Sequence, residues 1–343
     1  MHRQSLMQLA HPWMHRLVVC ALAATMSACA IEPDEVDSTS VESAATVTQW
    51  LDDVQVPNQM SAREPALAYY GGKLHMVHNG NTYPNDLWWS TFDGATWSPN
   101  VKLSGFESDG GPALVPYAGR LYMAFHRAGA NELDISTTAG GSWTTPSVVH
   151  PPYYVTFRHA PSATVYGTKL YVASCFTSTN GNQGIILESF DGTTWSNTIV
   201  DTAMYWGTCE AVALQPIDGQ LHLLTTWHYH STYLGTTLID QTPIYEAVLL
   251  PTYAEVDGMY MDSRLPPAMT TCNGYVFLVH SGDSTPDQIW WSYRPATGGG
   301  SWSPNERLTN QTSDGGSGIG CFDGTPIIAH NGGTNQLWWA SYR

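Results

Sequence analysis

The chain has 343 residues, and its 13 Lys and Arg against 29 Asp and Glu give a formal net charge of −16. This balance argues against binding to the phosphate backbone of nucleic acids, which requires a basic surface. Hydrophobic residues form 43% of the chain and include 14 Trp and 18 Tyr, so a core can form and intrinsic disorder is excluded. Few charges, with 31 Gly and 21 Pro, favour an all-β protein of short strands.

Residues 1–28 have the pattern of a signal peptide. A basic segment precedes an apolar run, residues 17–28, that is too short to span a bilayer. The run leads into MSAC, residues 26–29, which resembles the lipobox of bacterial lipoproteins with Met in place of the usual Leu. The resemblance implies lipidation of Cys29 and anchoring to a bacterial cell-envelope membrane, whereas simple cleavage would release a secreted protein. Residues 29–46 are predicted to be a flexible acidic tether.

A phrase of two strands joined by a Gly turn recurs six times in the rest of the chain. Clear copies begin at Pro65 (PALAYYGGKLHMVH), Pro112 (PALVPYAGRLYMAF) and Pro161 (PSATVYGTKLYVAS), and weaker copies begin at Ala211, Pro267 and Ser317. A second phrase ends four of the units in a tryptophan, namely Trp97, Trp143, Trp195 and Trp302. Units of about 50 residues with four strands each are typical of β-propeller blades.

The sixth unit stops at Arg343 without its Trp-bearing outer strand. A segment at the other end of the repeats, VTQWLDDVQV at residues 47–56, matches the outer-strand pattern and places Trp50 at the repeated position. We predict that this segment completes the last blade and closes the ring, which leaves no open sheet edge. Residues 47–343 are therefore predicted to form a monomeric, all-β, six-bladed propeller of four-stranded antiparallel blades.

Two turns carry a family resemblance. STFDGATW, residues 90–97, and ESFDGTTW, residues 188–195, resemble the Asp-box turns of the sialidase superfamily and of bacterial and fungal propeller lectins. Asp93 and Asp191 would be the box aspartates. Such turns lie away from the propeller axis, and we expect the Asp to cap a hairpin and the Trp to pack between blades. The resemblance covers roughly residues 47–343 and implies a sialidase-like propeller.

Charged residues gather where the innermost strands begin, which is the face on which propellers bind ligands at their axis. Three of the eight Arg in the predicted mature chain fall at these entrances, in alternate blades. The candidate ligand-binding residues of this mouth are Arg63, Glu64, Asp109, Arg158, His159, Glu210, Arg264 and Asp314. They are predicted either to form a polar pocket for a hydroxylated or anionic ligand or to form ion pairs around a wet channel.

The sialidase resemblance extends only partly to this mouth. Sialidases use three arginines, an acidic acid/base and a Tyr–Glu pair, and Arg63 in SAREPAL resembles the first of these arginines. However, Arg158 falls one blade too early, and the sixth blade begins SDGGSGIG without a Tyr. We therefore do not transfer the sialidase reaction. If the protein is a glycosidase, its candidate catalytic carboxylates are Asp109, Glu210 and Asp314.

A second candidate set lies on loops of the same face. The segment WHYHSTY supplies the candidate ligand contacts Trp227, His228 and Tyr229. Sugar sites combine aromatic faces with hydrogen-bonding groups of this kind; contact with a peptide and plain packing of the loop are the alternatives. His228 and His230 could instead bind zinc, but no third ligand is evident, so no metal or other cofactor is expected. The loops HNGNTYPN and HNGGTN begin at His78 and His330, and these histidines are expected to pack between blades.

Four cysteines fall within the predicted propeller, and an exported domain can keep disulfides. Cys175 ends the second strand of blade three and Cys209 begins blade four, so both should lie on the ligand face. Cys272 and Cys321 lie late on the innermost strands of adjacent blades, toward the opposite face. We predict the bonds Cys175–Cys209 and Cys272–Cys321, because other pairings mostly join opposite faces. The alternative is four reduced, buried thiols that act as small apolar residues.

Two classes of function follow from the mouth and the resemblance. The first is a lectin-like propeller with one polar central site for an extracellular or cell-surface glycan. The second is a sialidase-like glycoside hydrolase acting on an extracellular glycan, and a protein-interaction scaffold is a third possibility. The missing Tyr and the displaced Arg158 favour binding without cleavage. Contact with a membrane is expected only through the lipid anchor, and the sequence does not name the sugar.

Overall fold

The computed structural model describes residues 49–82, 85–149, 155–200, 208–231, 239–241, 244–250, 254–256, 261, 263, 265–282 and 288–343. Of these, the side chains of residues 158, 208, 228–231, 239–241 and 254–256 lie outside the description. The predicted signal peptide, the lipidation site Cys29 and the tether lie wholly outside it. All described residues belong to one compact unit, Thr46–Arg343. Among the described residues, no helix is long and apolar enough to cross a membrane.

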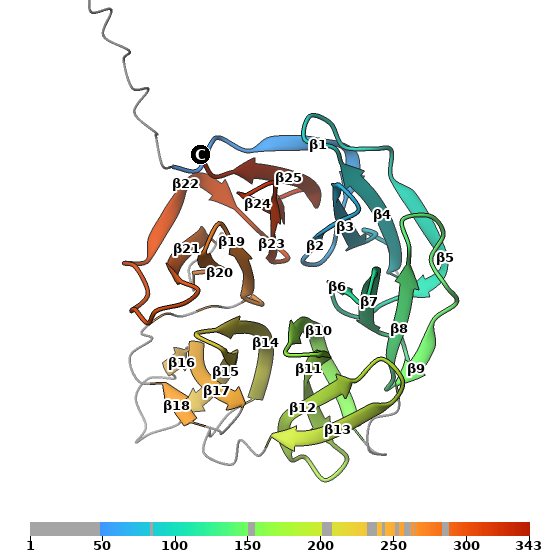
Figure 1. The fold of residues 1–343 in the computed structure, drawn as a ribbon, viewed down its shortest axis with the longest axis vertical. Helices are drawn as coiled ribbons and strands as arrows, with labels where there is room; N and C mark the ends of the chain where they lie inside the picture. Colours follow the sequence, from blue (N-terminus) through green and yellow to red (C-terminus); the bar gives the residue numbers. More distant parts are fainter. Residues whose placement is uncertain are drawn as a thin grey trace, which may run out of the picture. The chain divides into compact units, whose positions relative to one another are not determined.

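Six antiparallel sheets are arranged in a ring, which confirms the six-bladed propeller (Figure 1). In blades one to five, chain order runs from the innermost to the outermost strand. Blade one comprises β2 (Ala66–Tyr70), β3 (Lys73–Asn79), β4 (Asp86–Phe92) and β5 (Val101–Glu107). Blade two comprises β6 (Ala113–Tyr117), β7 (Arg120–His126), β8 (Leu133–Thr138) and β9 (Ser147–Val149). Blade three comprises β10 (Val155–Tyr166), β11 (Lys169–Ser178), β12 (Gln183–Phe190) and β13 (Trp195–Val200).

The second half of the ring follows the same plan with one addition. Blade four comprises β14 (Thr208–Ile217), β15 (Gln220–Ser231), β17 (Ile244–Leu250) and β18 (Ala254–Val256), and β16 (Ile239–Gln241) also pairs with β15. Blade five comprises β19 (Ala268–Cys272), β20 (Tyr275–Ser281), β21 (Gln288–Pro295) and β22 (Glu306–Thr312). Blade six comprises β23 (Ser317–Phe322), β24 (Thr325–Asn331), β25 (Gln336–Ser341) and β1 (Val54–Met60).

The ring is closed by β1, which pairs antiparallel with β25 of the last blade. The closure was predicted, although β1 begins at Val54 and continues beyond the predicted end at Val56 to Met60. Trp50 forms an isolated bridge with Tyr342, as Trp97 does with Phe92 in blade one. The tryptophan repeat therefore identified the closing strand correctly.

The hydrophobic core lies between neighbouring blades. Between blades six and one, Leu74 and Met76 of β3 are fully buried with Val56 of β1 and Ile327 of β24. The two Asp-box turns behave as predicted: each aspartate Oδ1 accepts two backbone N–H bonds, at 2.9 and 2.8 Å in the first turn and at 2.8 Å in the second. These hydrogen bonds lower the pKa of the second box aspartate, Asp191, to about 2.

The recurrent histidines are buried, as expected for packing residues. Nε2 of His78 lies 3.3 Å from Oδ1 of Asn100, just before the outer strand of its blade. Nδ1 of His330 lies 3.1 Å from the carbonyl oxygen of Thr312 in the neighbouring blade, which is an inter-blade contact. Burial lowers the pKa of His78 to about 4, so its imidazole is neutral at pH 7.

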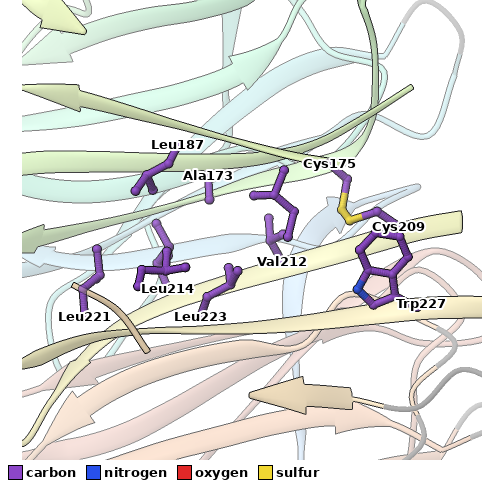
Figure 2. Packing of buried hydrophobic residues seen from close by; sticks show 11 residues of the cluster. Ala173, Cys175, Leu187, Cys209, Val212, Leu214, Leu221, Leu223 and Trp227 are labelled. Carbon is purple, nitrogen blue, oxygen red and sulfur yellow. A yellow bond between two sulfur atoms is a disulfide. The ribbon is translucent and has the colours of Figure 1, made fainter. Parts of the chain in front are cut away.

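Both predicted disulfides are present. Cys175–Cys209 joins blades three and four with a Cα–Cα distance of 5.6 Å, and Cys272–Cys321 joins blades five and six at 5.4 Å. The first bond lies at one end of a core cluster that includes Val212 (Figure 2). Reading strand direction from the repeat therefore selected the correct pairing among the three that four cysteines allow.

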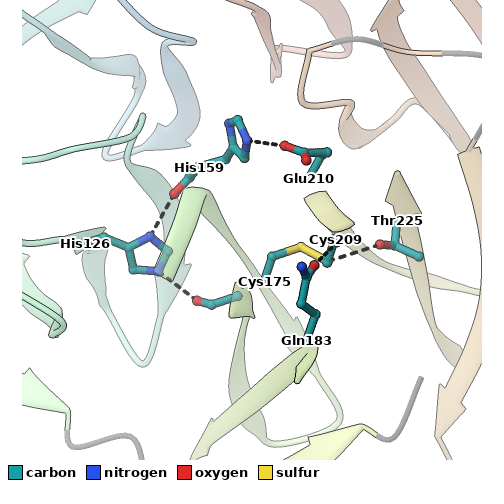
Figure 3. The surroundings of a disulfide bond; sticks show 8 residues. His126, His159, Cys175, Gln183, Cys209, Glu210 and Thr225 are labelled. Carbon is teal, nitrogen blue, oxygen red and sulfur yellow. Dashed lines mark hydrogen bonds and ion pairs between the residues drawn. A yellow bond between two sulfur atoms is a disulfide. The ribbon is translucent and has the colours of Figure 1, made fainter. Parts of the chain in front are cut away.

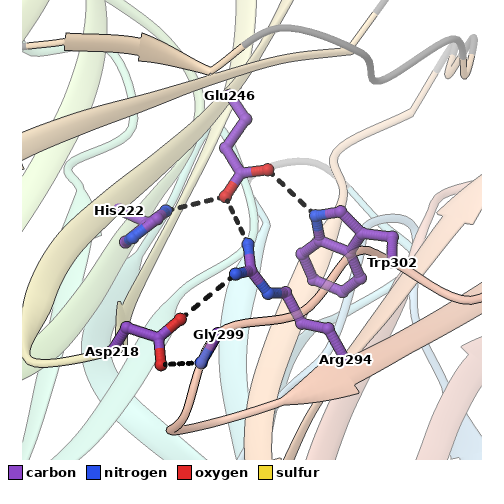
Figure 4. A network of polar contacts seen from close by, with 6 residues as sticks. All are labelled: Asp218, His222, Glu246, Arg294, Gly299 and Trp302. Atoms are coloured by element: carbon purple, nitrogen blue, oxygen red, sulfur yellow. Dashed lines mark hydrogen bonds and ion pairs between the residues drawn. The ribbon is translucent and has the colours of Figure 1, made fainter.

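A buried ionic network joins blades four and five (Figure 4). Oε1 of Glu246 lies 2.7 Å from Nδ1 of His222 and 3.3 Å from the guanidinium of Arg294. Its Oε2 accepts the indole N–H of Trp302 at 2.9 Å. Burial opposes ionisation of Glu246, but these partners outweigh it and hold the pKa of the carboxyl below its usual value. The network fixes the two blades to each other and lies outside the predicted mouth.

Candidate functional site

The axis of the propeller is narrow. The axial cavity has a volume of about 100 Å³ and is lined by the innermost strands of all six blades, mostly by proline and other apolar residues. Pockets for small-molecule ligands usually measure roughly 300–1,000 Å³. The axial cavity is therefore smaller than a usual ligand pocket. The candidate site is the mouth, where the innermost strands begin.

Glu64 is a buried residue that lines the axial cavity. Its carboxylate Oε1 accepts the backbone N–H of Gly111 in blade two at 3.3 Å. A Cβ atom placed on Gly111 would lie 2.6 Å from Cγ of Glu64, and one on Gly316 of blade six would lie 2.8 Å from Cβ of Glu64. Burial raises the pKa of this carboxyl, against the opposing effects of its backbone hydrogen bonds and of the charges on His159 and Arg63. Glu64 of blade one is thus packed against blades two and six, and positions 111 and 316 require glycine because a Cβ atom there would clash with it.

His159 and Glu210 form the clearest polar pair of the mouth (Figure 3). Nε2 of the histidine lies 2.7 Å from Oε2 of the glutamate, and their side chains are 33% and 19% exposed. His159 has a φ of 52°, a left-handed conformation that is uncommon for a residue with a side chain. The pair is therefore partly open to solvent and held by an unusual backbone conformation.

A buried histidine supports this pair from blade two. Nδ1 of His126 lies 2.7 Å from the carbonyl oxygen of His159, and its Nε2 lies 2.9 Å from the hydroxyl of Ser174. The imidazole also stacks on Phe157, with ring centroids 4.4 Å apart. Because Nδ1–H donates to the carbonyl, Nε2 is left to accept the serine O–H. Burial lowers the pKa of His126 to about 4, which keeps this neutral form.

The Cys175–Cys209 disulfide fixes the other half of the pair. Cys209 immediately precedes Glu210, and its backbone N–H donates to Oε1 of Gln183 in blade three at 2.9 Å (Figure 3). The glutamate is thereby tied to the same blade that carries His159. The mouth pair is set by contacts from blades two, three and four together.

Three other predicted mouth residues are exposed at separate blade entrances. Oδ2 of Asp109 accepts the backbone N–H of Gly129 at 2.9 Å, and the backbone N–H of Asp314 donates to the carbonyl of Asn331 at 3.2 Å. The carbonyl oxygen of Arg63 accepts the hydroxyl of Ser61 at 2.6 Å. Among the described residues, neither aspartate forms an ion pair. Their carboxylates are therefore accessible to solvent.

The remaining predicted residues divide into buried and undescribed ones. Trp227 is 1% exposed and packs beside the disulfide within the core of blades three and four (Figure 2). Arg158 lies on β10, and His228 and Tyr229 lie on β15, but their side chains are outside the described residues, as is the whole of Arg264. His126 was not predicted from the sequence. Its repeat position, which Asn79 and Asn331 occupy in blades one and six, does not by itself indicate a contact with the mouth.

Comparisons with known proteins agree with this fold. No protein-family model and no curated protein sequence matches the chain. A protein of unknown function from Dyadobacter fermentans aligns with a TM-score of 0.61 at 15% identity, over 86% of this chain and 98% of that one. The Hadza microbial sialidase Hz136 aligns with a TM-score of 0.58 at 16% identity, over 81% of this chain and 65% of that one. The Trypanosoma rangeli sialidase in complex with sialic acid aligns with a TM-score of 0.57 at 13% identity, over 83% of this chain and 54% of that one.

These likenesses define the class of fold. The chain shares its propeller with the two sialidases, in agreement with the Asp-box resemblance, and it spans under two thirds of their length. Identities of 13–16% establish the fold alone. The chemistry of the mouth has to be argued from its own residues.

Proposed function

We propose that the protein is an exported, monomeric, lectin-like propeller that binds a glycan at its axial mouth without cleaving it. The observation that carries the proposal is the His159–Glu210 pair, 2.7 Å apart and partly exposed at the entrance of a narrow axis. An imidazole and a carboxylate held in fixed positions provide a donor and acceptors for sugar hydroxyls. The propeller fold shared with sialidases supports a glycan as the ligand.

The neighbouring charges extend the proposed site. Asp109 and Asp314 supply exposed carboxylates at two other blade entrances, and Arg63 supplies an exposed guanidinium. We assign Arg158 and Arg264 to the same mouth from their repeat positions, as contacts for an anionic group of the ligand. His228 and Tyr229 are assigned to its rim on the same basis. Such a distribution suits one ligand that spans several blades.

A glycan array followed by titration of the best ligand tests the site. Glu210→Gln and Arg158→Ala are expected to weaken binding roughly 10-fold to 100-fold, because each removes a charge-assisted hydrogen bond. Glu306→Gln, an exposed carboxylate on β22 outside the mouth, is the matched control and should bind like the parent. Equal affinity of all three variants and the parent would place the ligand elsewhere.

The hydrolase alternative is favoured by the sialidase fold, and it makes a different prediction. A sialidase-like enzyme would release the chromophore from aryl glycosides, including sialosides, and Asp109→Asn or Glu210→Gln would abolish that turnover. The lectin proposal expects no turnover of any glycoside in the panel. Detection of turnover that depends on these carboxylates would replace the lectin proposal with the hydrolase.

Export is proposed on separate grounds. Two disulfides persist in oxidising compartments outside the cytosol. With the lipobox-like segment at residues 26–29, they support a lipoprotein anchored through Cys29 in a bacterial cell envelope. Metabolic labelling with a fatty acid should label the parent and leave Cys29→Ala unlabelled. Unlabelled parent protein in the medium would show simple secretion instead.

A further inference from the structure

A groove between blades six and one has the dimensions of a ligand site. It measures about 520 Å³ and lies between β1 of blade six and the β3–β4 loop of blade one. Its lining includes Asn58, Met60, Asn81, Asp86, Trp88 and Asn100. This volume falls within the usual range for small-molecule pockets, unlike that of the axial cavity. None of the residues proposed for the mouth lines it.

The frame of the groove is fixed by contacts between blades. Gln59 of β1 donates from Nε2 to the carbonyl of Ser98 at 3.3 Å and accepts the hydroxyl of Ser90 at 3.0 Å. On the opposite wall, a Cβ atom added to Gly80 would lie 3.0 Å from Nε1 of Trp88. The indole is thus packed edge-on against the loop backbone. A frame that is buried and hydrogen-bonded across two blades needs little ordering when a ligand binds.

The groove combines an aromatic wall with polar groups and has little net charge. Asp86 is the one acidic residue among the described residues that line the groove, and Lys102 lies 2.7 Å from its carboxylate. Asn81 is exposed and donates to the sulfur of Met60 at 3.4 Å, which is a weak hydrogen bond that a better acceptor can replace. Amide donors and acceptors therefore stand beside an indole in a nearly neutral environment. Such a setting does not favour an anionic ligand.

We propose that this groove is a second binding site, separate from the mouth, for a neutral pyranose residue. A pyranose ring has an apolar C–H face that packs on an indole and equatorial hydroxyls that hydrogen-bond to amides and carboxylates. Trp88 provides the first kind of contact, and Asn81 and Asp86 provide the second. The inference does not depend on the function proposed for the mouth, because the two sites share no residue.

The junction between blades five and six repeats this frame without the proposed ligand contacts. Nε2 of Gln311 donates to the carbonyl of Leu51 at 3.2 Å, as Gln59 does in the groove. Gly332 packs against Trp338, with an added Cβ 2.9 Å from the indole Nε1. However, the loop sequence HNGGTN places Gly333 where HNGNTYPN has Asn81, and Gln336 replaces Asp86. The junction between blades five and six is thus a natural control for the amide of Asn81 and the carboxylate of Asp86.

The test is saturation-transfer NMR with a panel of neutral methyl pyranosides and the intact propeller. At least one pyranoside should bind, and Trp88→Ala and Asn81→Gly should weaken its binding at least 10-fold. Asn81→Gly copies blade six at an exposed loop position, so it tests the site without disturbing the core; thermal unfolding verifies that both variants fold. Trp338→Ala and Glu210→Gln should bind like the parent.

Three outcomes would overturn the proposal. These are absence of binding to every neutral pyranoside, unchanged binding by Asn81→Gly, and a loss in Trp338→Ala as large as that in Trp88→Ala. A loss confined to Glu210→Gln would assign the pyranoside to the mouth and would leave the function proposed there intact. Conversely, a mouth that binds no glycan while the groove variants lose pyranoside binding would support this proposal alone.

Discussion

The carbonyl oxygen of His159 lies 2.7 Å from Nδ1 of His126, so a buried histidine of blade two holds the backbone of a mouth residue in blade three. The contact occurs where His159 has its left-handed φ of 52°. This conformation directs the imidazole toward Glu210, which comes from blade four. The geometry of the mouth therefore depends on a residue that is itself 3% exposed and does not face the ligand.

Acid should weaken the fold through His126. Its pKa is lowered from 6.5 to about 4 in the folded protein, so the unfolded chain takes up the proton first. The contribution of neutral His126 to the free energy of unfolding is fully present above pH 6.5. It is lost as the pH falls toward 4, by up to about 3 kcal/mol. His126→Asn places there the residue that Asn79 and Asn331 provide in blades one and six. Urea unfolding between pH 7.5 and 4.5 should show a shallower pH dependence for this variant, and identical slopes would contradict the assignment.

Glu188 should have the opposite pH dependence. It is 2% exposed on β12, its Oε1 has no hydrogen-bond partner among the described residues, and burial raises its pKa to about 7. The folded state then binds the proton more tightly, so the contribution of Glu188 to stability is fully present below pH 4.5 and is lost as the pH rises through 7. Glu188→Gln should stabilise the protein at pH 8 by up to about 3 kcal/mol and have little effect at pH 4.5. Blades one, two and five have serine here, so Glu188→Ser is a second variant expected to behave alike.

Removal of the closing strand should be severely destabilising. Deletion through Val56 takes away Trp50 and the first three of the seven residues of β1, and it exposes part of the edge of β25 to solvent. Val56 is fully buried and Trp50 packs on Trp291 of blade five, so the free energy of unfolding should fall by more than about 3 kcal/mol. Deletion of residues 1–45 is the control and should leave the melting temperature unchanged. A truncation through Val56 that melts like the parent would show that closure contributes nothing.

Loss of Arg294 from the network around Glu246 should lower the free energy of unfolding. Arg294→Met would leave the carboxylate of Glu246, which is 2% exposed, with one cation fewer. Removing one partner of a buried ion pair typically costs about 3–5 kcal/mol. The double variant Arg294→Met, Glu246→Gln should recover part of that loss, because the buried charge is then removed too. Denaturant unfolding of the two variants measures this coupling, and equal stabilities would indicate that the network is not coupled.

The repeat determined how much of the molecule could be predicted. Apolar alternation around a Gly turn set the blades, Trp50 at the repeated position identified the closing strand, and strand direction selected the disulfides. The mouth could be predicted only as a set of positions. That His159 meets Glu210 depends on a left-handed backbone and on support from His126, neither of which leaves a sequence pattern.

The groove between blades six and one could not be predicted from the sequence, for a related reason. It forms between strands that are distant in the chain, and β1 reaches blade one only because the ring is closed. The loop HNGNTYPN could be placed on the ligand face from its repeat position. Its opposite wall, which includes Asn58 with a φ of 55°, could not be assigned without the tertiary contacts of Gln59.

The pairing of the two ends of the ring has a topological consequence. Gln49 and Arg343 exchange backbone hydrogen bonds of 2.6 and 3.0 Å, so a short linker could join them. A circular permutant opened between Gly192 and Thr193 would then begin with β13 and end with β12, and it would close blade three as the natural chain closes blade six. The native ring should form from either starting point, because each blade contacts its neighbours regardless of which one contains the break.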